Sequence, residues 1–380
     1  MAAARWMAPS GQVCWATMRR ATSSTTGQAK RVSVIGGMGT MLSPSATHFT
    51  GSPFQVVAAH ARPSALKERV EAWQEHGAKV CSTVEDTLKE DSDMVIICVG
   101  KNGDDLPIIA KTADQWAGTN KAILHFSTVS PRFVEAAKNY CASKGVRYGN
   151  YPLTGGPVGA QQATMLILAS GSRSLYDEFE PVLQTIGKPR FFSEEVVRGA
   201  VVKLQVQMMA FGGLLGISSA AATGAASLSM EVKQSTELTE LMDFLNGGAG
   251  STRQWDAALA RGVRGGDWQE GFQVDHAAID AVYAADAANG FGLSQVTQGM
   301  LSMTAASLAY LVAKADGGRL ATHSIAKELR NSRELDEFIR PLWSSLGDYE
   351  KSSAAVLDLL PARLRGRACL NITEDSFREA

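Results

Sequence analysis

The chain has 380 residues, a formal net charge of −1 and 45% hydrophobic residues, enough for a full core and two or three domains. A charge this close to zero argues against nucleic acid or a membrane surface as a partner. The six histidines form no HxxxH pair and the five distant cysteines form no CxxC pair, which argues against a metal site and favours reduced thiols.

Residues 1–30 differ in composition from the rest of the chain. They contain Arg5, Arg19 and Arg20, no acidic residue, and several hydroxyl residues between Thr22 and Thr26. This composition is typical of an organellar transit peptide. We therefore expect a mitochondrial protein, with a plastid or cytoplasmic location as alternatives, and leave the segment out of the fold.

Short β-branched runs alternate with helical patterns over residues 31–195. The runs are apolar throughout, which indicates strands that are covered on both faces. The alternation predicts a doubly wound parallel sheet of the Rossmann type that binds NAD(P). The predicted strands are 31–36, 55–59, 94–99 and 122–126, and the predicted helices are 64–75, 106–116 and 131–143.

The character of the sequence changes near residue 196, after which long Ala-rich segments predict an all-α domain over 196–330. We expect this domain to contribute to substrate binding and oligomerisation. Residues 331–380 predict a helical extension with a frayed, charged end. The stretch 208–230 is uncharged and long enough to cross a bilayer, but its many small residues favour a buried helix. The expected helices are 197–230, 238–246, 274–289 and 294–313.

The first strand leads into a glycine-rich loop, Gly37-Met38-Gly39-Thr40-Met41. Two glycines allow a tight turn and let the backbone approach a pyrophosphate. Leu42 stands where a Rossmann fingerprint has its third glycine. We expect the loop to bind a dinucleotide at the head of a helix.

The end of the second strand distinguishes NAD from NADP. An acidic residue there binds a ribose hydroxyl, whereas an arginine accepts a 2′-phosphate. The segment 60–64 contains Arg62 and no acid. This favours NADP, with NAD as the alternative.

Two later segments predict a substrate site. Ser127 and Thr128 follow the fourth strand, and hydroxyls at the carboxyl end of a parallel strand face the ligand crevice. Thr154, Gly155 and Gly156 form a loop whose backbone N–H groups can bind a carboxylate.

One lysine lies among apolar residues at the start of the long helix that follows. Lys203 must either reach water or hold a perturbed pKa, because an unpaired buried ammonium is costly. A surface position would explain the lysine alone. The preceding loops favour a proton donor and acceptor instead.

These motifs resemble the β-hydroxyacid dehydrogenase family, the 3-hydroxyisobutyrate dehydrogenase-like enzymes, over residues 31–325. The glycine loop is similar to the family's cofactor loop, segment 127–131 to its S-T-x-x-P element, segment 152–160 to its substrate loop, and segment 199–207 to the start of its catalytic helix. The resemblance implies NAD(P)-dependent oxidation of a short β-hydroxy acid, with Lys203 as the general acid or base.

The resemblance also implies roles for further residues. Val99 and Thr128 join the cofactor contacts, and Gln207 stands in place of a family asparagine beside the substrate. The family pairs a lysine with the aspartate that Asp280 matches, but Ile279 occupies the lysine's position. These departures indicate a divergent member with an altered substrate or an impaired site.

We therefore predict a dehydrogenase of a short β-hydroxy acid or a reductase of the matching semialdehyde, working as a homodimer or homotetramer. The alternative is a catalytically impaired protein that binds a cofactor or partner on the same scaffold. A six-phosphogluconate dehydrogenase type is disfavoured because it needs a longer helical region, and imine reductases usually lack the lysine.

Overall fold

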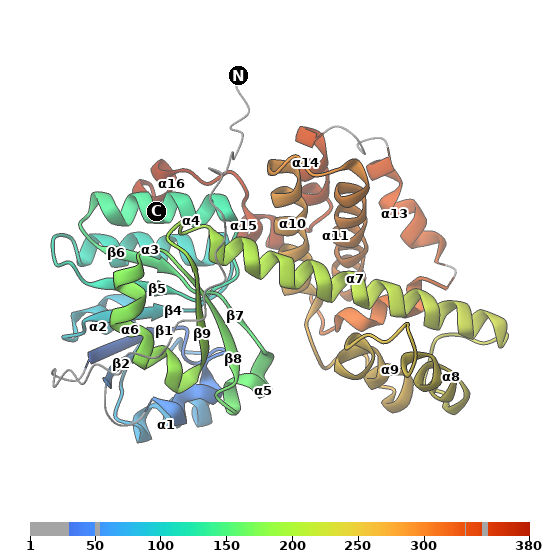
Figure 1. Cartoon of the computed structure of the whole chain (residues 1–380), viewed down its shortest axis with the longest axis horizontal. Helices are drawn as coiled ribbons and strands as arrows, with labels where there is room; N and C mark the ends of the chain where they lie inside the picture. Colours follow the sequence, from blue (N-terminus) through green and yellow to red (C-terminus); the bar gives the residue numbers. More distant parts are fainter. Residues whose placement is uncertain (1–29, 50–53, 331, 344–348) are drawn as a thin grey trace.

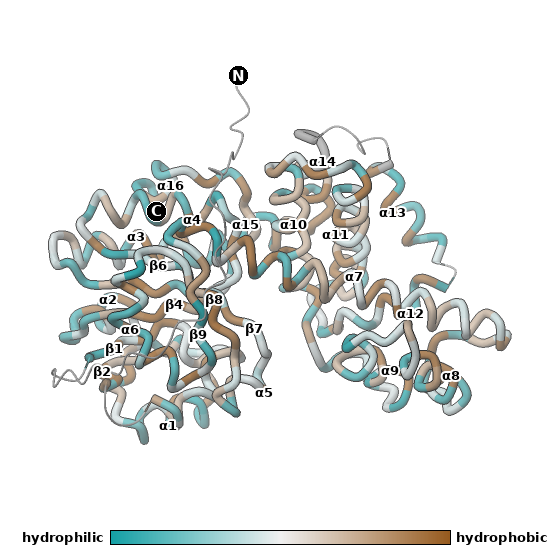
Figure 2. Tube along the Cα trace, viewed as in Figure 1, coloured by the Kyte–Doolittle hydropathy of each residue, from teal (hydrophilic) through white to brown (hydrophobic). Residues whose placement is uncertain are grey.

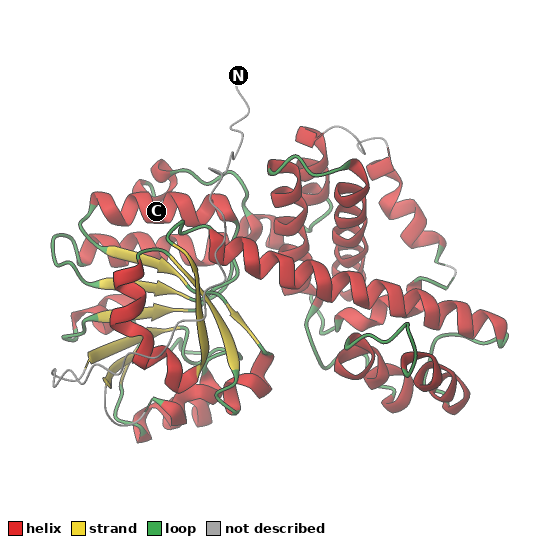
Figure 3. Cartoon of the chain, in the orientation of Figure 1, coloured by secondary structure: helices red, strands yellow, loops and turns green. Residues whose placement is uncertain are grey.

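The computed structural model describes residues 30–49, 54–330, 332–343 and 349–380. These residues form a sheet domain covered by helices and a helical domain, connected by one long helix, α7 (Figure 1 and Figure 3). The predicted transit peptide lies outside the described residues apart from Lys30.

The sheet of the described residues has nine strands in the order β3-β2-β1-β4-β5-β6-β8-β7, with β9 beside β8. Strands β1 to β6 pair in parallel, whereas β8 is antiparallel to β6 and β7. The order reverses between β1 and β4, the switch point of a doubly wound sheet. The predicted Rossmann-type fold followed by a helical domain is confirmed. The strands are Lys30–Ile35 (β1), Phe54–His60 (β2), Lys79–Cys81 (β3), Met94–Ile97 (β4), Ala122–His125 (β5), Arg147–Asn150 (β6), Leu153–Thr154 (β7), Met165–Ser170 (β8) and Gly187–Ser193 (β9).

Alternate residues of the central strands enter two different cores. In β4, Met94 and Ile96 join one core, while Val95 and Ile97 join the other. Helices cover both faces, which is why these strands are apolar throughout. Figure 2 shows the apolar strands inside more polar helices. The helices of this domain are Lys67–Glu75 (α1), Val84–Lys89 (α2), Asn102–Gln115 (α3), Pro131–Ser143 (α4), Gly156–Gln161 (α5) and Arg173–Ile186 (α6).

The segment after β1 differs from the prediction. In place of a helix headed by the glycine loop, a short 3-10 helix, η1, spans Ser43–His48. Leu42 is fully buried in the core that also contains Trp73. The expected helix is therefore wrong, because Leu42 and the segment that follows turn into the core.

The helical domain is built around α7 (Arg198–Ser227) and an alanine-rich pair, α10 and α11. Small residues let α10 and α11 pack closely along most of their length. The remaining elements are Thr236–Asn246 (α8), Trp255–Leu259 (η2), Ala260–Gly265 (α9), Val274–Gly290 (α10), Gln295–Ala315 (α11), Thr322–Ser324 (η3), Ile325–Glu328 (α12), Arg333–Trp343 (α13) and Tyr349–Asp358 (α14).

The last residues return to the sheet domain as α15 (Ala362–Ala368) and α16 (Glu374–Arg378). Phe377 is buried between Phe133 and Tyr140, with ring centroids 5.4 and 5.6 Å away. The expected frayed end is therefore wrong, since apolar side chains of this segment, among them Leu364, Ile372 and Phe377, are buried in the two domains.

Two helices of the described residues, α7 and α11, are long and apolar enough to cross a membrane. Length and composition are weak evidence, because core helices of other proteins pass the same test. Leu308, Ala309 and Leu311 of α11 are buried in the helical core, which accounts for their apolar character.

Candidate active site

The crevice of the sheet begins where β1 and β4 diverge. Gly36 follows β1 with a φ of +91°, and a Cβ there would lie 2.0 Å from the carbonyl oxygen of Cys98. Only glycine permits this approach. The close contact brings the loop after β1 and the loop after β4 together at the switch point, where ligands of such sheets bind.

The glycine loop is fixed from the side of α1. Trp73 Nε1 donates to the carbonyl of Gly37 at 3.0 Å, and Arg69 donates to the carbonyl of Met38 at 2.9 Å. The backbone N–H groups of Thr40 and Met41 have no partner within the described residues. Unpartnered N–H groups at this place fit a dinucleotide phosphate, although the usual helix is replaced by η1.

Arg62 lies at the same edge of the sheet. His60, two residues earlier, pairs in register with Ile35, the last residue of β1. Arg62 is exposed, and burial together with this guanidinium lowers the pKa of His60. An exposed cation beside the glycine loop fits a 2′-phosphate.

The loop after β4 meets the end of β5. The N–H of Val99 donates to the hydroxyl of Ser127 at 3.1 Å, so the Ser127 proton stays free to donate. Thr128 follows and is half-buried. The predicted residues Val99, Ser127 and Thr128 therefore gather at the crevice.

Lys203 lies one turn into α7, which begins against the sheet. The N–H of Gly199 donates to Ser170 at 2.7 Å, and a Cβ at Gly199 would be 2.7 Å from the carbonyl oxygens of Asn150 and Leu168. This contact fixes the start of the helix at the carboxyl edge of β6. Lys203 is 7% exposed and has no hydrogen bond within the described residues.

Burial sets the acidity of this lysine. Loss of water lowers the pKa of Lys203 to about 8, while Asp280 raises it and Lys101 lowers it. A lysine with such a pKa exchanges its proton near neutral pH.

Asp280 of α10 contacts residues of α7 and of the sheet domain; we call Lys101, Lys203 and Asp280 the lysine cluster. Gln207 Nε2 donates to Asp280 Oδ2 at 2.6 Å, and Lys101 forms a buried ion pair with Oδ1. Ile279 points into the apolar core of the helical domain. The sequence analysis missed Lys101, although its place just after the end of a central parallel strand could have indicated it.

The predicted carboxylate loop stands apart from this cluster. Gly155 and Gly156 have φ values of +133° and +68° and precede α5. No hydrogen bond within the described residues joins Thr154, Gly155 or Gly156 to Lys203. Figure 1 places α5 at the far end of β7 and β8 from the start of α7.

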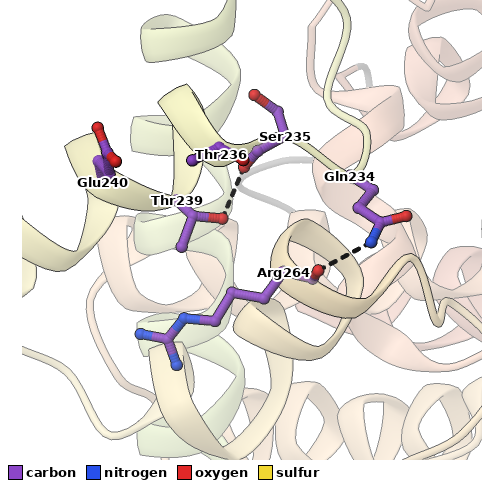
Figure 4. A pocket seen from close by; sticks show the side chains of 6 residues that line it. All are labelled: Gln234, Ser235, Thr236, Thr239, Glu240 and Arg264. Carbon is purple, nitrogen blue, oxygen red and sulfur yellow. Dashed lines mark hydrogen bonds between the residues drawn. The ribbon is translucent and has the colours of Figure 1, made fainter.

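A polar pocket between α8 and α9 is shown in Figure 4. Its polar groups bond to one another, with Gln234 donating to the carbonyl of Arg264 and Thr239 donating to the carbonyl of Ser235. Arg264 also pairs with Asp243. The pocket lies in the helical domain and contains none of the residues described above, so we do not treat it as the active site.

Comparisons with known proteins agree with this fold. Residues 31–202 match the family described as the NAD binding domain of 6-phosphogluconate dehydrogenase. The chain is 29% identical to an uncharacterized oxidoreductase of Synechocystis sp. over 267 residues, 69% of this chain and 87% of the relative. It is 26% identical to the mitochondrial 3-hydroxyisobutyrate dehydrogenase of Drosophila melanogaster over 266 residues, 69% of this chain and 76% of the relative.

Among solved structures, the Mycobacterium tuberculosis 3-hydroxyisobutyrate dehydrogenase with L-serine superposes with a TM-score of 0.65 at 20% identity, covering 80% of this chain and 100% of that one. The family match shows an NAD-binding domain over residues 31–202, and the superposition shows a shared Rossmann-type fold with a helical domain. In sequence and fold, the chain is thus similar to 3-hydroxyisobutyrate dehydrogenase-like members of the β-hydroxyacid dehydrogenase family.

Proposed function

We propose that the protein interconverts a short β-hydroxy acid and its semialdehyde with NAD(P), using Lys203 as the general acid or base. The observation that carries the proposal is a buried lysine, with its pKa lowered to about 8, beside the switch point of the sheet. A group with a pKa near the working pH transfers protons in both directions.

The protein's own groups account for the proton and the orientation. In oxidation, neutral Lys203 takes the proton of the substrate hydroxyl as the carbon–hydrogen bond breaks. Bound NAD(P) supplies the acceptor for the hydride. The free Ser127 proton donates to a substrate oxygen, and Gln207 fixes Asp280 beside the lysine.

Thr154, Gly155 and Gly156 are proposed to bind the substrate carboxylate. The backbone N–H groups of Gly155 and Gly156 have no partner within the described residues, which suits an anion. The carboxylate and hydroxyl of a short β-hydroxy acid are only a few ångströms apart, so this role requires the loop to lie close to Lys203 when the substrate is bound.

We propose NADP as the preferred cofactor, because Arg62 is exposed at the cofactor edge and the segment 60–64 carries no acid. Gly37, Met38, Gly39, Thr40 and Met41 would approach the phosphates, and Val99 and Thr128 the nicotinamide side.

Cell location and assembly are part of the proposal. The composition of residues 1–30 and the mitochondrial relative support a mitochondrial destination. Exposed apolar side chains on the helical domain, including Val296, Met300 and Phe244, support a homodimer or homotetramer.

The test combines binding with turnover. A ligand that binds only the folded state raises the thermal midpoint, so NADP should raise it more than NAD. A panel of short hydroxy acids and semialdehydes, followed by nicotinamide absorbance, should then identify the substrate. No midpoint shift with either nucleotide, together with no turnover, would contradict the proposal.

A further inference from the structure

The lysine cluster contains two buried ammonium groups and one carboxylate. Lys101 and Lys203 are 5% and 7% exposed, and Asp280 is 2% exposed. Lys101 engages one oxygen of Asp280, and Gln207 engages the other. Each carboxylate oxygen thus has one partner, and the Lys203 amine has no hydrogen-bonding partner in the described part of the chain.

An unpaired buried ammonium beside a buried carboxylate is an unusual arrangement. Direct pairing with Asp280 would be the ordinary way to offset the burial of Lys203. Lys101 of the sheet domain forms this ion pair instead, and Lys203 does not. The Lys203 amine therefore has no ion pair to stabilise its charged form, and it can exchange its proton.

The backbone around Lys101 is firmly held. The N–H of Lys101 donates to Asp104 at 2.9 Å, and Asp104 is bound in turn by Arg367. The N–H of Asn102 donates to Tyr283 of α10 at 3.0 Å. Tyr283 lies three residues after Asp280, so one face of α10 receives both contacts. The lysine is thus directed at Asp280 by two domains.

We propose that Lys101 is a positioning residue of the active site, which holds the Asp280 carboxylate away from Lys203 and so keeps Lys203 available for proton transfer. Lys101 thereby gives Asp280 a lysine partner, although Ile279 occupies the position of the lysine that the resemblance implies. The inference rests on the proposed function only in taking Lys203 as the proton-transfer group.

Few other charges face the cluster. Cys98, at the end of β4, has its pKa raised to about 12 by burial and stays neutral. His276 of α10 has its pKa lowered by burial and by Lys101. On neighbouring helices, Glu328 is paired with Lys314, and Arg132 faces Asp286. Lys101 and Asp280 therefore dominate the electrostatics at Lys203.

The test measures the acidity of Lys203 without requiring turnover. Only the neutral amine reacts with acetic anhydride, so the labelling of Lys203 against pH, quantified by peptide mass spectrometry, gives its apparent pKa. In Lys101→Met, Asp280 is free to pair with Lys203, and we expect the pKa to rise by about one unit or more, which lowers labelling at neutral pH about tenfold. Lys101→Arg keeps the charge and should leave the pKa near that of the wild type.

Asp280→Asn should shift the pKa in the opposite direction, because the attracting carboxylate is lost. Adding Lys101→Met to Asp280→Asn should raise the pKa by less than Lys101→Met does alone, because no carboxylate is left to pair with Lys203. If Lys101→Met fails to fold, Lys101→Gln serves in its place. Lys111→Met, at an exposed pair on the same helix α3, is the matched control and should change nothing.

An unchanged Lys203 pKa in folded Lys101→Met would overturn the inference, and so would an equally large rise in the Asp280→Asn background, because Lys101 would then act on Lys203 by its charge alone. Absence of Lys203 labelling up to about pH 10 would overturn it as well, since a sealed amine transfers no proton. If the shifts appear but the wild type turns over no hydroxy acid or semialdehyde, the inference stands and the proposed function fails.

Discussion

The two ends of the crevice depart from the family pattern in different ways. At the cofactor end, Leu42 replaces a glycine and becomes core, and η1 replaces a helix. At the proton-transfer end, Lys203 stays in place, and Lys101 of the sheet domain forms an ion pair with Asp280 of the helical domain. The effect of a residue that differs from the family pattern therefore depends on the side chains that surround it in the folded protein.

The largest expected effect tests the proton-transfer end. Lys203→Ala removes the general acid or base, so turnover should fall about a thousandfold. Cofactor affinity should stay nearly unchanged, because the glycine loop is untouched. Steady-state rates and nucleotide titration measure the two quantities. Lys233→Ala, at an exposed lysine of the helical domain, is the control. Retained turnover in Lys203→Ala would show that Lys203 is not the general acid or base, and the proton-transfer end would lose its assigned role.

The next effect concerns the cofactor end. Leu42→Gly restores the family's glycine but empties a fully buried position, so the free energy of unfolding should fall by about 2–5 kcal/mol without tighter nucleotide binding. Denaturant unfolding and nucleotide titration check both. Leu228→Gly, at a half-exposed leucine, should cost much less. Tighter nucleotide binding in Leu42→Gly would show that Leu42 impairs the loop.

The pH dependence sharpens the account of Lys203. Oxidation needs the neutral amine, so its kcat/KM should rise about tenfold per pH unit up to a pH of about 8 and then level off. Reduction needs the ammonium and should decline above the same pH. Profiles of both directions over a broad pH range test this. If the same pH dependence persists in Lys203→Ala, the titrating group is a residue other than Lys203.

The smallest effect concerns the choice between cofactors. Arg62→Ala removes an exposed charge from the cofactor edge, so the affinity for NADP should fall about tenfold while that for NAD changes little. Nucleotide titrations of the variant give both values. Arg253→Ala, at an exposed arginine of the helical domain, should alter neither. Equal losses for NADP and NAD would assign Arg62 to general phosphate attraction.

Periodicity alone predicted much of the fold. Helix α4 has the predicted bounds, and α7, α10 and α11 lie within a few residues of them, because long Ala-rich or well-capped helices carry strong local signals. Strands β7 and β9 were missed, since each is fixed by pairing with β8 and not by a local pattern. The final helices were missed because they are short and are held by long-range contacts, such as Leu364 in the helical core and Phe377 against Phe133.

The site was also predictable only where its residues lie in local sequence motifs. Lys203, Gln207 and Ser127 stand out beside local motifs. The partnership of Lys101 with Asp280 joins residues 179 positions apart on two domains, and no local pattern predicts it. The distance of the Gly155-Gly156 loop from Lys203 also depends on the path of β7 and β8.

The most direct measurement is the protection of Lys203 from acetic anhydride. The wild-type protein would be labelled with and without saturating NADP and a short β-hydroxy acid, with exposed Lys233 as the internal reference. We predict that labelling of Lys203 falls several-fold when both ligands are present, while that of Lys233 is unchanged. Equal labelling of Lys203 in both conditions would show that this amine lies outside the reaction site and would contradict the account.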